Sequence, residues 1–270
     1  MKITIAGGDQ RMNTVAEKFG ELGYVCERIG FDESNVENAL KNTSAVIFPI
    51  PYCKGNNLNA PLSNSDISLE KIFSLVGKDT LLLGGGLPET EENRIDYAKN
   101  EGFLLQNARI TAEGAISVAM NSLNTTLCGS NAVILGYGRI GGCLTDMLRS
   151  LGVHVSVMAR RSISRLQAEL SGAKSAGFED IEASFSEADV IFNTVPTPIA
   201  DEKVISVLNP KALFIDLASL PGGLTKVAEE FLGERYIRAL GLPGKYAPET
   251  AGRVIFETVF EILRERGALV

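Results

Sequence analysis

Histidine and cysteine, the usual ligands of zinc in proteins, are scarce in this chain of 270 residues. There is one histidine, His154, and the four cysteines include no C-x-x-C pair. A structural zinc site needs about four clustered nitrogen or sulfur ligands, which this sequence hardly supplies. We therefore expect no metal site; a metal held by carboxylates is the alternative. We interpret the cysteines as free thiols in a reducing compartment.

The chain also lacks an excess of positive charge and any long apolar run. Its 26 Lys and Arg against 33 Asp and Glu give a net charge of −7, which disfavours general nucleic-acid binding because that needs a cationic surface. No apolar stretch approaches the ~20 residues that cross a bilayer. Met1 leads directly into a strand-like run, without a basic and apolar leader. We expect a cytoplasmic protein that binds neither nucleic acid nor membrane.

Short apolar runs alternate with helical patterns along the chain. This alternation predicts an α/β protein of two domains, a flavodoxin-like parallel-sheet N-terminal domain and a doubly wound Rossmann domain. The predicted strands cover residues 2–6, 24–29, 45–49, 80–84, 103–105, 132–135, 154–159, 190–194 and 213–216. The predicted helices cover residues 12–22, 34–41, 69–76, 91–100, 111–127, 139–151, 163–170 and 247–266.

The domain limits follow from this pattern. Residues 1–110 with 246–270 form the expected N-terminal substrate and partner domain, because the terminal helix of two-domain dehydrogenases often packs back on the first domain. Residues 111–130 are the expected bridging helix, and 131–245 the expected Rossmann NAD(P)-binding domain. Residues 50–66 are polar and contain Pro and Gly, which predicts a long loop, often functional or mobile.

Three glycines, Gly136, Gly138 and Gly141, form a G-x-G-x-x-G motif between a buried apolar strand and an amphipathic helix. The first allows a tight turn, the second lets the backbone approach a pyrophosphate, and the third lets the helix pack close to the strand. The helix N-terminus then offers free N–H groups and a positive dipole to the phosphates. The motif predicts a dinucleotide site; a glycine-rich turn without ligand is the alternative.

The second Rossmann strand bears on the choice of cofactor. An acidic residue at its end would bind the adenosine ribose and favour NAD, but here Arg160 and Arg161 follow the strand. Two guanidinium groups can hold a 2′-phosphate, so we expect NADP to be preferred and NAD to be accepted. Alternatively, Arg160 stacks on adenine and Arg161 is solvated, which would leave dual specificity.

Turns after two later strands should complete the cofactor site, because ligands bind at the carboxyl edge of open α/β sheets. Residues 193–196 should border the adenosine–ribose path, and residues 217–223 should lie near the nicotinamide. The expected cofactor-binding residues are Gly136, Gly138, Arg139, Ile140, Gly141, Arg160, Arg161, Asn193, Thr194, Val195, Pro196, Ala218 and Ser219.

Two blocks, LASLPGG at 217–223 and LGLPGKYAPETAG at 240–252, resemble the dipicolinate synthase A subunit family. Further matches are GGDQR at 7–11 and TAEGA at 111–115, and the resemblance is weakest at 54–68. It implies NAD(P)-dependent oxidation of a cyclic dicarboxylate to pyridine-2,6-dicarboxylate (dipicolinate) during sporulation, in the mother cell. The implied substrate is the product of the aspartate-semialdehyde and pyruvate condensation in the lysine branch. The implied partner is a smaller flavoprotein B subunit.

A small cyclic dicarboxylate needs cations and backbone donors. Arg11, after the first strand, could fork onto a carboxylate, while Asp9 orients it or moves a proton; alternatively the two form a structural pair. Lys245, in a turn before the last helix, could neutralise the second carboxylate or assist proton transfer; alternatively it is a solvated lysine. The expected catalytic residues are Asp9, Arg11 and Lys245, and the expected substrate-binding residues are Gly8, Asp9, Arg11, Gly222, Gly223 and Lys245.

His154 begins the second Rossmann strand and is expected to be structural. The histidine acid/base of 2-hydroxy acid dehydrogenases is then missing, which fits a reaction that aromatisation itself drives. Two other functions stay open: another two-domain NAD(P)-dependent dehydrogenase of a small carboxylate, and a non-catalytic NADP-binding subunit that positions the flavoprotein. We expect a homo-oligomer, a dimer or larger, as is common for dehydrogenases of this build.

Overall fold

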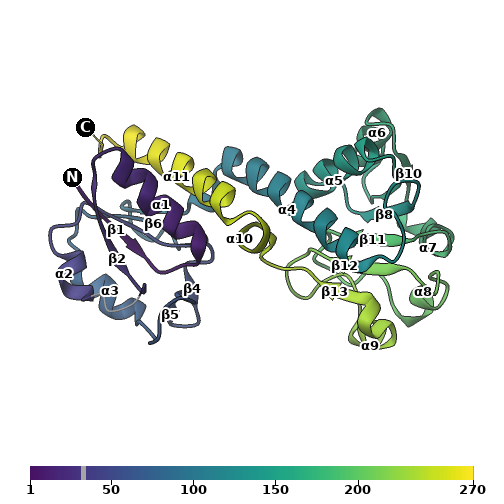
Figure 1. Cartoon of the computed structure of the whole chain (residues 1–270), viewed down its shortest axis with the longest axis horizontal. Coiled ribbons are helices and arrows are strands. Elements are labelled where there is room, and N and C mark those ends of the chain that lie inside the picture. Colours follow the sequence, from purple (N-terminus) through teal and green to yellow (C-terminus); the bar gives the residue numbers. More distant parts are fainter. Residues whose placement is uncertain (32–34, 270) are drawn as a thin grey trace. The chain divides into compact units, whose positions relative to one another are not determined.

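A computed structural model describes residues 1–31 and 35–269. The chain forms two compact units, Met1–Asn107 with Gly244–Val270, and Ala108–Pro243 (Figure 1). Each unit contains a parallel sheet, so the α/β class expected from the alternation of strands and helices is confirmed.

The sheet of the first unit has five strands in the order β2-β1-β3-β6-β7, and all its pairings are parallel. This order corresponds to the flavodoxin-like arrangement. The strands are β1 (Lys2–Ala6), β2 (Val25–Ile29), β3 (Ala45–Ile47), β6 (Leu81–Leu83) and β7 (Arg94–Ile95). A short hairpin, β4 (Cys53–Lys54) with β5 (Asn57–Leu58), lies within the segment expected to be a loop.

Helices cover this sheet and also pack on one another. They are α1 (Gln10–Glu21), α2 (Val36–Leu40), α3 (Leu69–Leu75) and α11 (Pro248–Glu265), with a 3-10 turn at Tyr97–Lys99. Apolar residues of α2 and α3 share a core with β3 and β6. Helix α11 lies alongside α1 (Figure 1), where the rings of Phe19 and Phe256 meet edge to face at 4.9 Å. The predicted helix 34–41 begins at Ser34, which lies outside the described residues.

Residues 91–122 differ from the prediction. Helix α4 runs over Glu101–Ser122, so the predicted strand 103–105 is wrong, and the helix predicted at 111–127 starts and ends earlier. The predicted helix 91–100 is also wrong, because β7 and the 3-10 turn occupy it. The Asn100 side chain accepts the N–H of Phe103 at 2.9 Å, so the short apolar run begins a helix rather than a strand.

The sheet of the second unit has six parallel strands in the order β10-β9-β8-β11-β12-β13. This is the doubly wound 3-2-1-4-5-6 order, so the expected Rossmann fold is confirmed. The strands are β8 (Asn131–Leu135), β9 (His154–Met158), β10 (Lys174–Ala176), β11 (Val190–Asn193), β12 (Leu213–Asp216) and β13 (Tyr236–Arg238). The two edge strands, β10 and β13, were not predicted.

Helices lie on both faces of this sheet. They are α5 (Arg139–Ser150), α6 (Ser162–Leu170), α7 (Ile181–Ser186), α8 (Glu202–Ser206) and α9 (Lys226–Leu232), with 3-10 turns at Phe178–Asp180 and Gly233–Arg235. The short α10 (Leu242–Tyr246) contains the boundary between the units, because Leu242 and Pro243 belong to the second unit and the residues from Gly244 onward to the first. Residues of α4 and α5 share one core with β8, while residues of α7, α8 and α9 share another. Within the described part of the chain, no helix is both long and apolar enough to span a membrane.

Candidate functional site

The glycine motif forms a tight turn between β8 and α5. Gly136 has a φ of +92°, which glycine adopts without strain. A Cβ on Gly141 would lie 2.2 Å from the carbonyl oxygen of Gly136, so the helix packs directly on the turn. A Cβ on Gly138 would meet no atom within 4 Å, so the backbone there is open to a ligand. Each glycine therefore meets the physical requirement that the motif predicts.

The N-terminus of α5 is suited to an anion. Gly138 is its N-cap and provides no side-chain acceptor for the first N–H groups of the helix. Those groups and the helix dipole can therefore act on a phosphate. Arg139 and Ile140 are the first two residues of α5, where the expected phosphate contacts would be made.

Two arginines follow β9 at its carboxyl end. Arg160 and Arg161 are both exposed, and across residues 1–31 and 35–269 neither guanidinium group has a hydrogen-bond or ion-pair partner. Arg165 fixes the backbone beside them, because its Nη1 donates to the carbonyl oxygens of Ala159 at 2.9 Å and Arg160 at 3.0 Å. The arrangement leaves two cationic groups available at the strand end.

The turn at residues 193–196 is held from within. Asn193 is fully buried, its Nδ2 donates to the carbonyl oxygen of Val195 at 3.0 Å, and its Oδ1 accepts the N–H of Val195 at 3.0 Å. Thr194 Oγ1 donates to the carbonyl oxygen of Leu135 at 2.8 Å, which ties the turn to the end of β8. Pro196 is exposed. The Asn193 side chain thus organises the turn, while later residues of the turn reach the surface.

Asp216, the last residue of β12, is a functional candidate that is not among the residues predicted from the sequence. It is fully buried, and its carboxylate accepts four hydrogen bonds. Oδ1 accepts Asn193 Nδ2 at 2.8 Å and the N–H of Ala218 at 3.0 Å. Oδ2 accepts the N–H of Gly223 at 2.9 Å and the hydroxyl of Tyr236 at 3.1 Å. This carboxylate therefore joins the carboxyl ends of β11 and β12, the first residue of β13 and both ends of one turn.

A second carboxylate and an arginine extend this cluster. The Tyr236 hydroxyl also lies 3.0 Å from Glu229 Oε1, and Arg238 Nη1 lies 3.5 Å from the same oxygen. Arg238 Nη2 donates to the carbonyl oxygen of Pro221 at 3.3 Å. Burial, followed by the negative charges of Asp216 and Glu229, raises the pKa of Tyr236, so its hydroxyl keeps its proton as a donor.

The paired glycines of the PGG block fit against these side chains. Gly222 has a φ of +96°, and a Cβ there would lie 2.7 Å from Asp216 Oδ2. A Cβ on Gly223 would lie 2.3 Å from Asn193 Nδ2. Their lack of side chains is thus explained by close packing within the protein. Ser219, in the same turn, is exposed.

The first unit carries a bidentate ion pair at the end of β1. Arg11 Nε donates to Asp9 Oδ1 at 2.8 Å, and Arg11 Nη2 donates both to Asp9 Oδ2 at 3.0 Å and to the carbonyl oxygen of Ile50 at 3.0 Å. Asp9 is also the N-cap of α1. Burial alone would raise the pKa of Asp9, but the hydrogen bonds and charge of Arg11 outweigh it and hold that pKa below its ordinary value.

Backbone from elsewhere in the first unit packs against this pair. A Cβ on Gly244 would lie 2.7 Å from Asp9 Oδ2. Gly8, buried with a φ of +93°, is equally crowded, since a Cβ there would lie 2.2 Å from Met12 Cγ. Lys245 lies in the short helix α10, so the expected turn is wrong. Lys245 is exposed, and among the described residues its ammonium group has no ion-pair partner.

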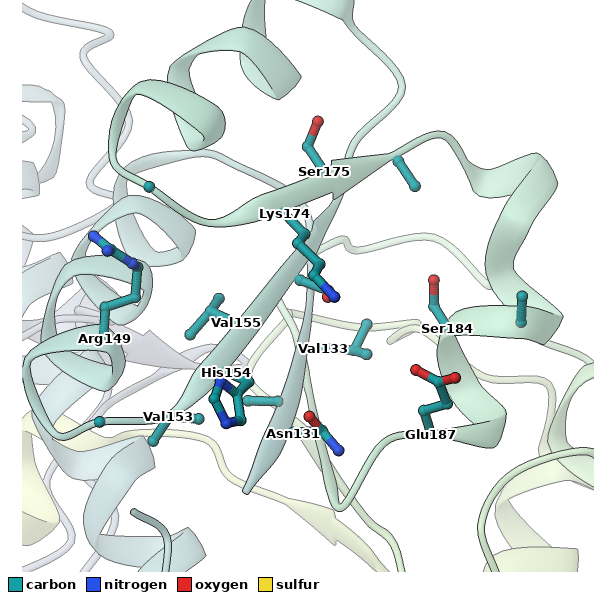
Figure 2. Close-up of a pocket in the computed structure, with 16 residues that line it drawn as sticks. Asn131, Val133, Arg149, Val153, His154, Val155, Lys174, Ser175, Ser184 and Glu187 are labelled. Atoms are coloured by element: carbon teal, nitrogen blue, oxygen red, sulfur yellow. The ribbon is translucent and has the colours of Figure 1, made fainter. Parts of the chain in front are cut away.

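A separate cavity of about 820 Å³ lies along β10 and the amino-terminal halves of β8 and β9. Figure 2 shows His154, Lys174, Glu187 and Asn131 among the side chains that line it. His154 pairs in register with Asn131, the first residue of β8, so it lies at the opposite end of the strands from the glycine motif. The cavity is thus distinct from the carboxyl edge, where the glycine turn and the strand-end turns gather.

Comparison with known proteins gives matches to both units. Residues 2–102 match the family described as the N-terminal domain of the A subunit of dipicolinate synthase. Residues 104–219 match the family described as D-isomer specific 2-hydroxyacid dehydrogenase, NAD binding domain. The second unit therefore carries a nicotinamide-dinucleotide-binding domain of the dehydrogenase type.

Matches over the whole chain agree with this division. The chain is 26% identical over 288 residues to the dipicolinate synthase A subunit of Bacillus subtilis (strain 168), covering 98% of this chain and 96% of that protein. A crystal structure of the same subunit from Bacillus halodurans is similar with a TM-score of 0.86 and 25% identity, covering 97% of each chain. A crystal structure of the Bacillus subtilis protein has a TM-score of 0.86 and 26% identity, covering 99% of this chain and 97% of that one. The resemblance seen in the sequence is confirmed.

Proposed function

We propose that this chain, which resembles the dipicolinate synthase A subunit over almost its whole length, is an NAD(P)-dependent oxidoreductase that forms pyridine-2,6-dicarboxylate. The substrate is the cyclic dihydro- or tetrahydrodipicolinate intermediate of the lysine branch. The hydroxylated tetrahydro form loses water to give the dihydro form, and removal of a hydride and a proton from the dihydro form leaves the aromatic ring. The observation that carries the proposal is the whole-length similarity combined with a glycine turn whose backbone is open to a ligand.

The second unit would hold the dinucleotide at the carboxyl edge of its sheet. Gly138 and the first turn of α5 would bind the pyrophosphate, and Ala218 and Ser219 would border the nicotinamide. When bound, the cofactor supplies a hydride acceptor. Arg160 and Arg161 support a preference for NADP over NAD, because both are exposed and unpaired within the described residues.

Arg11 would bind one carboxylate of the substrate. Its Nε and Nη2 are engaged by Asp9 and Ile50, whereas Nη1 has no protein partner among the described residues. Asp9 orients the guanidinium group and stays ionised, which favours an orienting role over proton donation. Lys245 is an exposed cation that would neutralise the second carboxylate.

The chain would act with a flavoprotein B subunit, because the relatives that it resembles are named as the A subunit of dipicolinate synthase. The same resemblance supports a role in the mother cell of a sporulating bacterium. We also propose a homo-oligomer, by analogy with dehydrogenases of this build.

The test is a reconstituted reaction with enzymatically generated lysine-branch precursor, NADP or NAD, and the purified chain with and without the flavoprotein. The expected result is the ultraviolet spectrum of an aromatic dicarboxylate together with formation of the reduced cofactor. Cofactor binding without turnover in either mixture would instead support a non-catalytic role. The absence of cofactor binding would refute both.

A second candidate is a dehydrogenase of another small carboxylate, favoured by the match of residues 104–219 to the 2-hydroxyacid dehydrogenase domain. The position of His154 at the amino end of β9 argues against it, because the histidine would have to act at the opposite edge of the sheet. Reduction of the cofactor by 2-hydroxy acids, without an aromatic product, would favour this second candidate.

A further inference from the structure

The carboxyl ends of β11 and β12 carry a pair of polar side chains that are fully buried. Asn193 and Asp216 are each 0% exposed, they pair in register across the two strands, and their side chains are hydrogen-bonded at 2.8 Å. We propose that Asp216 is a positioning residue, which acts with Asn193 to fix the turn at 217–223 and thereby the nicotinamide half of the cofactor. The inference rests on the proposed function, because it deepens the role of the same cofactor site.

The hydrogen bonds of Asp216 clamp the turn at both ends. The carboxylate accepts the N–H of Ala218 at the start of the turn and the N–H of Gly223 at its close. The same turn is tied to residues 193–199, because Asn193 O accepts the N–H of Leu217 at 2.9 Å and Gly223 O accepts the N–H of Ile199 at 2.9 Å. The turns at residues 193–199 and 217–223 are therefore hydrogen-bonded to each other at the carboxyl edge of the sheet.

The chemistry of the cluster requires a carboxylate at this position. Each of the four groups around Asp216 presents a hydrogen atom, and an ionised carboxylate is an acceptor only. An amide in its place has one accepting oxygen and one NH₂ group. Whichever way the amide turned, its NH₂ group would face the backbone N–H of Ala218 or of Gly223.

The part of the turn that Asp216 orders is exposed. Leu220 is 75% exposed and Ser219 is exposed, so the clamp does little to bury apolar surface. Burying a carboxylate is costly, and well-packed apolar residues would serve stability as well or better. The effect of the buried carboxylate is therefore to hold an exposed turn in one conformation, at the edge of the sheet where cofactors bind.

The test separates the two halves of the cofactor. Two ligands are used: the dinucleotide, NADP or NAD, that the wild-type chain binds more tightly, and the adenosine diphosphate fragment of that dinucleotide, which lacks the nicotinamide riboside. The affinity of Asp216→Asn for each ligand is compared with that of wild type. Asp189→Asn is the matched control, because Asp189 Oδ2 also accepts a backbone N–H, that of Asn131 at 2.8 Å, but at the amino edge of the sheet. Tyr236→Phe, which removes one hydrogen bond to Asp216, is the milder second variant.

The expected result is a loss of affinity for the whole dinucleotide of roughly ten-fold in Asp216→Asn, with the affinity for the adenosine fragment unchanged. Tyr236→Phe should show the same selective loss at smaller size, which decides the question if Asp216→Asn does not fold. Equal losses for both ligands, or no loss for either in a folded variant, would overturn the positioning role. Wild-type chain that binds neither ligand would instead refute the proposed function.

Discussion

The contact between Gly141 and Gly136 allows a sharp test of the cofactor turn. A methyl group on Gly141 would lie 2.2 Å from the carbonyl oxygen of Gly136, whereas carbon atoms prefer separations of about 3.5 Å, so α5 would have to move by roughly 1 Å. Overpacking of this kind costs about 1–3 kcal/mol, and the greater helix propensity of alanine recovers about 0.5–1 kcal/mol. We expect Gly141→Ala to lose about 1–2 kcal/mol of unfolding free energy.

The neighbouring glycine provides the control. A Cβ on Gly142 would meet no atom within 4 Å, so Gly142→Ala gains helix propensity without a clash and should be more stable by about 0.5–1 kcal/mol. The two variants differ by one position in the same helix turn. Thermal unfolding measures the contrast: Gly141→Ala should melt ~2–8 °C below wild type, and Gly142→Ala slightly above it.

Cofactor binding gives the second measurement. Displacement of the α5 N-terminus should weaken at least one charge-assisted hydrogen bond to the pyrophosphate, which corresponds to about a ten-fold loss of affinity or more in Gly141→Ala. Gly142→Ala should bind the cofactor as wild type does. If Gly141→Ala matched Gly142→Ala in both melting temperature and affinity, the close contact would have no energetic consequence and this account of the turn would fail.

Three further predictions concern charged and titratable residues. Arg160→Asp should weaken NADP binding by about 10–100-fold and NAD binding much less, since a charged hydrogen bond contributes about 1.5–3 kcal/mol; equal and unchanged affinities would disprove the NADP preference. Asp9→Asn should destabilise the chain at neutral pH, because the ion pair with Arg11 is removed. Since the folded pKa of Asp9 is lowered, the difference in melting temperature from wild type should shrink as the pH falls below the ordinary value of 3.8 and through the lowered folded pKa; a difference independent of pH would contradict the ion pair with Arg11. His154→Gln should leave the pH–rate profile unaltered, whereas disappearance of one limb of the profile in this variant would make the histidine catalytic.

The sequence predicts most strands because buried parallel strands have a strong signature. Continuous apolar runs between glycines and helical patterns place β1, β8, β11 and β12 close to their observed bounds. The same signature predicts a strand at residues 103–105, but these three apolar residues lie inside helix α4. Period alone cannot separate a short strand from a buried helix segment, and the deciding contact is the Asn100 cap on Phe103.

The edge strands were missed for a different reason. β10 and β13 have three residues each, and none of the residues of β13 is fully buried. Such strands form because a neighbour offers backbone partners, so their existence depends on the sheet rather than on their own composition. The glycine motif is easier to interpret, because its spacing between a buried apolar strand and an amphipathic helix predicts the turn, the approach to phosphate and the helix packing together.

The cluster around Asp216 shows what a sequence pattern leaves undetermined about a site. Asn193 and Asp216 each end an apolar strand, which was a usable signal, but they lie 23 positions apart in the chain and only the parallel pairing of β11 with β12 brings them into register. Gly222 and Gly223 are expected substrate-binding residues, and the space where their side chains would lie is taken by the side chains of Asp216 and Asn193. A glycine pair after a strand therefore has two physical explanations, close approach of a ligand or of a buried polar group. The sheet topology, which decides the neighbours, is needed to choose between them.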